Sequence, residues 1–204
     1  MSFQRHEESV EHAVAMPAVP DPDTLPTTEQ ELEALLSGGE LTAPQRDLVG
    51  RAMAMVQPLP LDVRFVGGMA NPFDEEPRDS RQLVWIRAQV PDPSADSGSP
   101  ELEGYMHRCI AAFASDWTLC NASLRPHGLS LMSKRLRMLT SIDHSMWYHR
   151  PFDATSWMLY ETDSPVATGA RSLNQGRLFD RQGQLCVSVT QEALLRADPL
   201  PVPP

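Results

Sequence analysis

Residues 102–116 constrain the fold more than any other part of the chain. They are predicted to form a helix whose apolar residues spread around most of its circumference. A helix that is apolar nearly all round is buried, so other elements must wrap it. One strand candidate, 82–90, precedes the helix and a run of strand candidates follows it. This order predicts an α+β fold with a curved antiparallel sheet wrapped around a central helix.

The strand candidates after the helix are 136–148, 157–161, 170–179 and 184–195. The segment DRQG at 180–183 is predicted to be the turn between the last two.

Proline divides the chain. Twelve of the nineteen prolines lie in residues 1–103 and four in the last six residues. Because proline interrupts sheets and helix interiors, the compact core is expected at about 80–198. Ahead of it, 16–26 is an acidic, extended connector.

Two short helices are expected after this connector. Thr28 and Glu31 resemble a capping box for the first, which Gly38 ends. An apolar stripe that includes Val49 and Val56 marks the second. Residues 92–100, rich in Pro, Ser and Asp, are expected to be an exposed loop.

Charge and cysteine content exclude several classes of protein. Residues 1–103 hold 19 acidic and 7 basic residues, a net charge of −12, which argues against nucleic-acid binding there. Residues 104–204 carry a net charge of +2, which tolerates an anionic ligand. Cys109, Cys120 and Cys186 form no CxxC motif, so a reduced compartment fits better than a disulfide framework. No apolar run is long enough to span a membrane.

Gln191 does not fit the pattern of the last strand candidate. Alternate residues from Leu185 to Leu195 lie on one face, and all except Gln191 are apolar. A buried carboxamide costs a few kcal/mol unless its hydrogen bonds are met. Either Gln191 has an internal partner, or the register is shifted, or the amide has a functional task.

Asp116 is the second residue out of place. It lies on the same face of the predicted helix as Tyr105 and Cys109, and close to its C-terminus. The helix dipole disfavours negative charge there. The carboxylate is therefore either a solvent-facing helix end or a group that orients or deprotonates water.

Other constellations are weaker. Asp143, His144 and Ser145 are triad residue types, but neighbours on a strand point to opposite faces, and no GxSxG motif exists. His144 and His149 are five residues apart, which also separates them on a strand, so a metal pair is not expected. No glycine-rich phosphate loop is present.

Residues 141–152, SIDHSMWYHRPF, closely resemble a signature of the type II acyl-CoA thioesterases. The resemblance covers about 60–198 and includes VWIR at 84–87, ASD at 114–116, RPHG at 125–128 and VTQE at 189–192. It implies a hotdog fold, with a curved antiparallel sheet around a central helix. The family pairs two such domains as a pseudo-dimer, with the site near their junction.

The resemblance further implies a catalytic constellation of Asp116, Ser141 and Gln191, with Ser141 where bacterial members often have Thr. The implied reaction is hydrolysis of a fatty acyl-CoA thioester to fatty acid and CoA, without metal or cofactor. Asp116, Ser141 and Gln191 would polarise a water, with the Gln191 amide or backbone N–H groups at the oxyanion. Asp116 as a covalent nucleophile is the alternative.

By this resemblance the chain divides into a remnant of the first hotdog domain and an acidic linker (1–25), a helical connector (26–60), a C-terminal hotdog domain (61–198) and a proline-rich tail (199–204). A homodimer or pairing with another hotdog domain is expected. The alternatives are a non-catalytic acyl-CoA-binding or regulatory half-domain and a structural subunit of a larger thioesterase. The resemblance indicates a peroxisomal protein, and the absence of a terminal Ser-Lys-Leu leaves the cytoplasm open.

Overall fold

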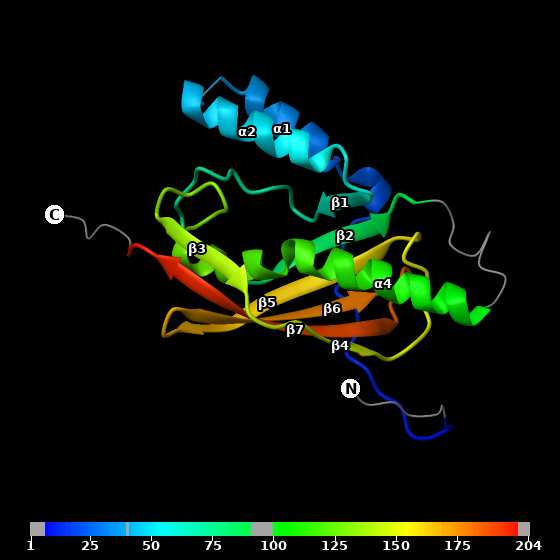
Figure 1. Cartoon of the computed structure of the whole chain (residues 1–204). Coiled ribbons are helices and arrows are strands. Elements are labelled where there is room, and N and C mark those ends of the chain that lie inside the picture. The colour runs from blue at the N-terminus through cyan, green and yellow to red at the C-terminus, as the bar shows by residue number, and fades with distance from the viewer. Residues whose placement is uncertain (1–6, 40, 91–99, 200–204) are drawn as a thin grey trace.

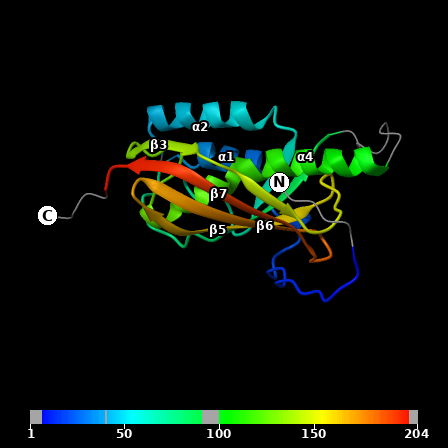
Figure 2. The same ribbon diagram turned by 60° about the horizontal axis from the view of Figure 1, so that its bottom comes forward.

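The computed structural model describes residues 7–39, 41–90 and 100–199. Within these residues, seven strands form one antiparallel sheet in the order β1-β2-β5-β6-β7-β3, and β4 also pairs with β7. The sheet curls around helix α4, which lies along its concave side (Figures 1 and 2). The predicted α+β architecture is confirmed. The elements are η1 (Pro22–Thr24), α1 (Thr28–Ser37), α2 (Ala43–Val56), β1 (Leu61–Phe65), β2 (Gln82–Ala88), α4 (Pro100–Thr118), η2 (Leu119–Ser123), η3 (Arg125–His127), β3 (Leu136–Ser141), β4 (Ser145–Tyr148), β5 (Met158–Thr168), β6 (Arg171–Phe179) and β7 (Leu185–Ala197).

The two sides of α4 differ in what covers them. Ala111 and Ala114 are buried in the main core, against the sheet. On the opposite side, Tyr105, Phe113 and Trp117 keep 59%, 50% and 41% of their surface exposed. The expected burial of the helix is therefore confirmed for the side that faces the sheet and wrong for the opposite side, because the sheet curls over one side only.

Strand β7 follows the predicted alternation over most of its length. Val187, Val189, Gln191 and Ala193 are all buried. At the start of the strand, a register shift in the pairing of β6 with β7 changes the pattern. Leu185 consequently packs in a second cluster with Trp157 and Phe179, apart from the main core that holds Val187.

The predicted strand 136–148 is two strands, β3 and β4, and both pair with β7. Between them, the backbone N–H of Ile142 donates to the carbonyl of Glu192. The Asp143 carboxylate then accepts the backbone N–H of Glu192, where a continuing strand would place a carbonyl. The expectation of one continuous strand is wrong, and the break frees Ser141 and His144 from strict alternation.

Helices α1 and α2 form as predicted, but the capping box of α1 lies one residue earlier than expected. The hydroxyl of Thr27 accepts from the backbone of Gln30, and the Gln30 side chain accepts from Thr27. Thr28 instead donates its hydroxyl to the carbonyl of Val63, and the Glu31 carboxylate accepts the backbone N–H of Met69. Tertiary contacts have therefore taken the two residues that the sequence pattern assigned to the cap.

The other strands agree with the predicted positions in part. Strands β2 and β6 lie where strands were expected, whereas β5 (Met158–Thr168) continues well beyond its predicted end at 161. The turn between β6 and β7 has Gly183 at φ 84°, a left-handed conformation that glycine adopts freely. Strand β1, which pairs with β2, was not predicted. The expected loop at 92–100 lies outside the described residues, except for Pro100, which begins α4.

Candidate active site

The structure brings together the three residues predicted for the site. The side-chain amide nitrogen of Gln191 lies 2.6 Å from the Asp116 Oδ1 atom and 2.5 Å from the Ser141 hydroxyl. The Ser141 hydroxyl is 3.5 Å from the same carboxylate oxygen, to which it donates. One carboxylate, one hydroxyl and one carboxamide therefore form a closed triangle of hydrogen bonds. Their catalytic role remains a prediction.

Each of these side chains comes from a different element. Asp116 lies in the last turn of α4, Ser141 is the last residue of β3, and Gln191 is inside β7. The pairing of Ser141 with Ala193 sets the end of β3 beside Gln191. Gln191 is fully buried, whereas the Asp116 side chain is 58% exposed. The constellation is therefore buried on the side of Gln191 and open to solvent on the side of Asp116.

Cys120 is a site residue that the sequence reasoning missed. Its thiol donates to the amide oxygen of Gln191 at 3.4 Å and lies 3.9 Å from the Ser141 hydroxyl. With its oxygen held by Cys120, the Gln191 amide turns both of its N–H groups toward Asp116 and Ser141. The buried amide is therefore satisfied, which answers the question that its position in the strand raised.

Protonation of the thiol matters for this contact. Burial raises the pKa of Cys120, a hydrogen bond with Ser141 opposes that rise, and the negative charge of Asp116 adds to it. The thiol therefore keeps its proton at neutral pH and can donate it to Gln191. A thiolate nucleophile is not what this environment favours.

His144 is a second residue that the sequence reasoning set aside. Its Nε2 atom lies 3.0 Å from the hydroxyl of Ser115, and its Nδ1 atom lies 3.9 Å from the Asp116 Oδ1 atom. Among the described residues, it is the only basic side chain within ion-pair distance of Asp116. Strand alternation had set His144 aside as a member of a triad with Asp143 and Ser145, and in the structure its ring lies beside Ser115 and Asp116 of α4 instead.

A buried tyrosine supports the end of α4 from below. The Tyr160 hydroxyl donates to the backbone carbonyl of Ser115 at 3.1 Å, and its side chain is fully buried. Burial holds the pKa of Tyr160 well above its usual value, and the negative charges of Cys120, once its thiol is ionised, and of Asp116 act in the same direction. Gly176 makes room for this ring, because a Cβ atom there would lie 2.5 Å from it. The position of Asp116 therefore depends on the core beneath it.

Among the described residues, no group of three or more His, Cys, Asp or Glu side chains could hold a metal ion. No helix in the same residues is long and apolar enough to cross a membrane. His149, considered with His144 as a metal pair, bonds the Ser188 hydroxyl at 2.9 Å instead. Burial and the charge of Arg150 lower the pKa of His149.

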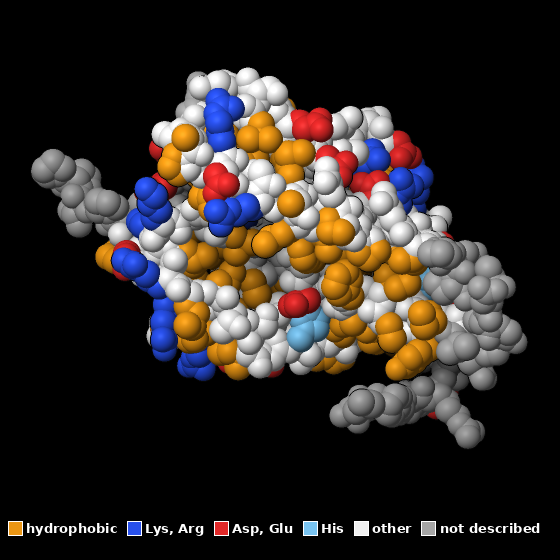
Figure 3. All heavy atoms as spheres, turned by 45° about the horizontal axis from the view of Figure 1, so that its top comes forward, with side chains coloured by type: hydrophobic (Ala, Val, Ile, Leu, Met, Phe, Trp, Pro, Cys, Tyr) orange, Lys and Arg blue, Asp and Glu red, His pale blue; other side chains and the backbone are white. Residues whose placement is uncertain are grey.

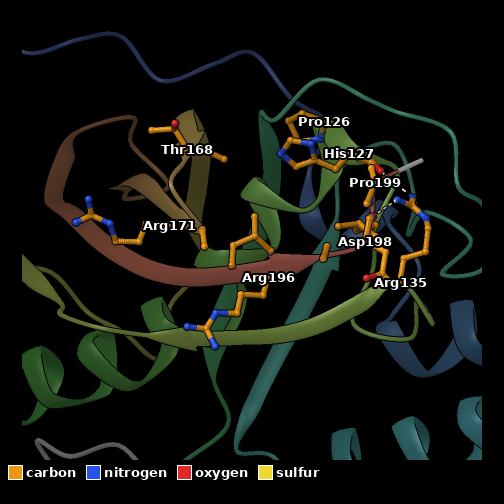
Figure 4. Close-up of a pocket in the computed structure, with 13 residues that line it drawn as sticks. Pro126, His127, Arg135, Thr168, Arg171, Arg196, Asp198 and Pro199 are labelled. Carbon is orange, nitrogen blue, oxygen red and sulfur yellow. Dashed lines mark hydrogen bonds between the residues drawn. The ribbon is translucent and has the colours of Figure 1, made fainter. Parts of the chain in front are cut away.

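A surface cavity lies beyond the site along β7. It measures about 580 Å³ and is bounded by the end of β7, the β5–β6 hairpin and the loop after η3 (Figure 4). Arg171 and Arg196 line it but extend away from its centre, and Arg171 pairs with Glu192. None of the three predicted site residues lines this cavity.

Comparisons with known proteins define first the fold and then the family. A protein of Alicyclobacillus acidocaldarius described as having a hot dog fold superposes with a TM-score of 0.58 at 15% identity, over 95% of this chain and 59% of its own. An acyl-CoA thioesterase II of Mycobacterium marinum superposes with a TM-score of 0.64 at 31% identity, over 96% of this chain and 60% of that one. The hotdog fold is therefore confirmed.

The sequence matches are more specific. The sequence profile of a family described as acyl-CoA thioesterase matches residues 79–194, a range that contains all three predicted site residues. Acyl-coenzyme A thioesterase 8 of Mus musculus is 35% identical over 203 residues, which cover 97% of this chain and 58% of the relative. Acyl-CoA thioesterase 2 of Haemophilus influenzae is 30% identical over 195 residues, covering 96% of this chain and 62% of the relative. The chain belongs to the acyl-CoA thioesterase family, and it spans 58% to 62% of the length of these two relatives.

Proposed function

We propose that this chain hydrolyses fatty acyl-CoA thioesters to a free fatty acid and CoA at Asp116, Ser141 and Gln191. The observation that carries the proposal is the bridge made by the Gln191 amide, which joins the Asp116 carboxylate and the Ser141 hydroxyl. A buried amide that holds a carboxylate and a hydroxyl at an exposed edge arranges two groups suited to binding one water. Family membership supplies the substrate class. Fatty-acid metabolism in the peroxisome or cytoplasm stays a prediction.

The geometry suggests a division of labour among the three side chains. Asp116 and Ser141 would hold and polarise the water, with the carboxylate raising its nucleophilicity. Gln191 has both N–H groups engaged, so its first task is to fix the positions of these two partners. The oxyanion would then be stabilised by backbone N–H groups, or by Gln191 after it releases Ser141. A thiolate leaves readily, so attack is the step that most needs assistance.

Direct attack by the Asp116 carboxylate on the thioester is the alternative route. Its side chain is 58% exposed, so an acyl carbon can reach it. Hydrolysis in H₂¹⁸O under single-turnover conditions can reveal this route. Attack by Asp116 forms a mixed anhydride with release of CoA thiolate, and water that opens it at the aspartyl carbon leaves ¹⁸O in the enzyme. Direct attack by water never labels the enzyme, so ¹⁸O in the Asp116 carboxylate would identify the covalent route.

A second hotdog domain is the partner that we propose for this chain. The outer face of α4 exposes four apolar residues, Tyr105, Met106, Phe113 and Trp117. The exposed Asp116 lies on the same face. Figure 3 shows a broad patch of apolar side chains on the side of the molecule that carries α4. Exposed apolar areas of this kind mark interaction sites. We take a second copy of this chain as the partner, since the same surface then covers itself about a two-fold axis.

The second candidate function is acyl-CoA binding without hydrolysis. The exposure of the site favours this alternative, because Asp116 and Ser141 both face solvent. Electrostatic catalysis works best where water is excluded. On this alternative, the chain binds a non-hydrolysable acyl-CoA analogue in calorimetry but releases no thiol.

Free-thiol release from medium- and long-chain acyl-CoA by the purified chain tests the proposal. Turnover by the natural chain should fall by about 10² to 10⁴-fold in Asp116→Asn, the usual contribution of acid–base assistance. The matched control is Asp143→Asn, a carboxylate in the same region that only accepts the backbone N–H of Glu192. A loss of the same size in both variants would place the effect in folding rather than in chemistry, and no turnover by the natural chain would refute the proposal.

A further inference from the structure

The arrangement of His144 beside Asp116 resembles a serine-hydrolase triad in residue type but not in role. Ser115, His144 and Asp116 are linked in series, by 3.0 Å from Ser115 to His144 and by 3.9 Å from His144 to Asp116. Ser115, however, is fully buried, so an acyl carbon cannot reach its hydroxyl. The hydroxyl is therefore an anchor for the histidine and not a nucleophile.

The hydrogen bonds around Ser115 favour one tautomer of His144. A serine hydroxyl has one proton, and the acceptors near that of Ser115 are the backbone carbonyl of Ala112 at 3.0 Å, the Met146 sulfur at 3.8 Å and His144 Nε2 at 3.0 Å. When the proton goes to the Ala112 carbonyl, the same oxygen accepts from His144 Nε2, which then carries a proton. In the neutral ring, Nδ1 is left with a lone pair, and it is this atom that faces Asp116.

The separation of Nδ1 from the carboxylate also carries information. At 3.9 Å the two atoms are too far apart for a direct hydrogen bond, and a water between them can lie within bonding distance of both. The His144 side chain is 24% exposed and that of Asp116 58%, so solvent and substrate reach this gap from the outer side. A water there has two acceptors, one anionic and one neutral.

We propose that His144 is the proton carrier of the proposed thioesterase site, with Nε2 anchored on Ser115 and Nδ1 aimed at the water that Asp116 holds. This inference rests on the proposed function. The water oxygen forms a bond to the thioester carbonyl carbon while one of its protons moves to Nδ1. The imidazolium so formed lies beside the Asp116 carboxylate, whose charge stabilises it.

Collapse of the tetrahedral intermediate completes the cycle. The C–S bond breaks with its electron pair going to sulfur, and the proton on Nδ1 moves to that sulfur. The products are the carboxylic acid, which keeps the second water proton until solvent removes it, and the free CoA thiol. His144 returns to the neutral Nε2–H form.

The tautomer can be tested without any turnover. Long-range ¹H–¹⁵N NMR on the whole chain, recorded at a pH at which the His144 ring is neutral and with His144 assigned by its loss in His144→Gln, should show Nε2 protonated and Nδ1 bare. Ser115→Ala, which removes the anchor, should increase the Nδ1-protonated form. A neutral ring with its proton on Nδ1 in the natural chain would overturn the proposal because no acceptor would then face the water.

Two isosteric variants test the step itself. The Gln side chain places its amide near Nε2 and keeps a donor for Ser115, whereas Asn places its amide near Nδ1. We expect kcat to fall by about 10²-fold or more in both, with KM and the unfolding midpoint of His144→Gln little changed, and free imidazole to restore part of its activity. Near-natural kcat in His144→Gln would show that the ring only holds Ser115 and would overturn the proposal. If the natural chain has no activity, the proposed function fails, and the NMR result still decides whether Nδ1 is bare.

Discussion

The two sides of helix α4 follow different rules. The inner side presents small residues, Ala111 and Ala114, to a sheet that buries them. The outer side presents Phe113 and Trp117, large apolar residues that stay about half exposed, and between them in sequence the carboxylate of Asp116. The fold of the described chain is therefore complete on one side of the helix, while the proposed catalytic carboxylate and the exposed apolar surface share the other. Stability should depend on the first side, and association and chemistry on the second.

The largest expected effect comes from the buried support of the inner side. Tyr160→Ala removes a fully buried ring and the hydrogen bond to the Ser115 carbonyl, so we expect the free energy of unfolding to fall by about 3 to 5 kcal/mol. Tyr160→Phe keeps the ring and should cost about 1 kcal/mol. Denaturant unfolding measures both. Equal losses in the two variants would show that the hydroxyl, and not the ring, is what supports α4.

Changes on the outer side should reverse this pattern. Phe113→Gln and Trp117→Gln should leave the free energy of unfolding of the dissociated chain within about 0.5 kcal/mol of the natural value. The same changes should weaken self-association by about 1 to 3 kcal/mol, roughly 5- to 150-fold in the dissociation constant. Sedimentation equilibrium measures the second quantity. A large loss of stability with unchanged association would mean that these side chains complete the core of a single chain.

The smallest expected effect concerns the thiol at the border of the two sides. Cys120→Ala removes the donor to the amide oxygen of Gln191, which should cost about 1 kcal/mol in kcat/KM, a loss of roughly fivefold. Cys120→Ser restores a donor and should recover most of that loss. Thiol-release kinetics on both variants provide the measurement. Loss in Ser as large as that in Ala would show that the size of the sulfur matters, and not its hydrogen bond.

The contrast between the buried and the exposed side of α4 also explains how much of the fold could be predicted from the sequence. Gln191 stood out because a strict alternation of apolar residues made a single amide conspicuous, and the structure shows it fully buried. The helix at α4 was recognised by its apolar circumference, but its expected burial holds only for the side that packs against the sheet. Sequence periodicity shows that a face is apolar, and it does not show which molecule covers it.

The parts of the site that were missed depend on irregular backbone. Period-two alternation set His144 aside, and only the break that Asp143 creates by accepting the Glu192 N–H brings it to α4. Cys120 lies in η2, a 3₁₀ segment without an apolar period, so no pattern singled out its thiol. Short irregular segments are fixed by tertiary hydrogen bonds, and these are visible only once the fold is known.

The most direct test is thiol release per chain as a function of chain concentration, measured together with sedimentation. We expect specific activity to rise in step with the fraction of associated chain, and Trp117→Gln to shift both curves to higher concentration alike. Specific activity that stays constant while the chain dissociates would show that one chain holds a complete site. An associated chain that releases no thiol would contradict the assignment of hydrolysis to Asp116, Ser141 and Gln191.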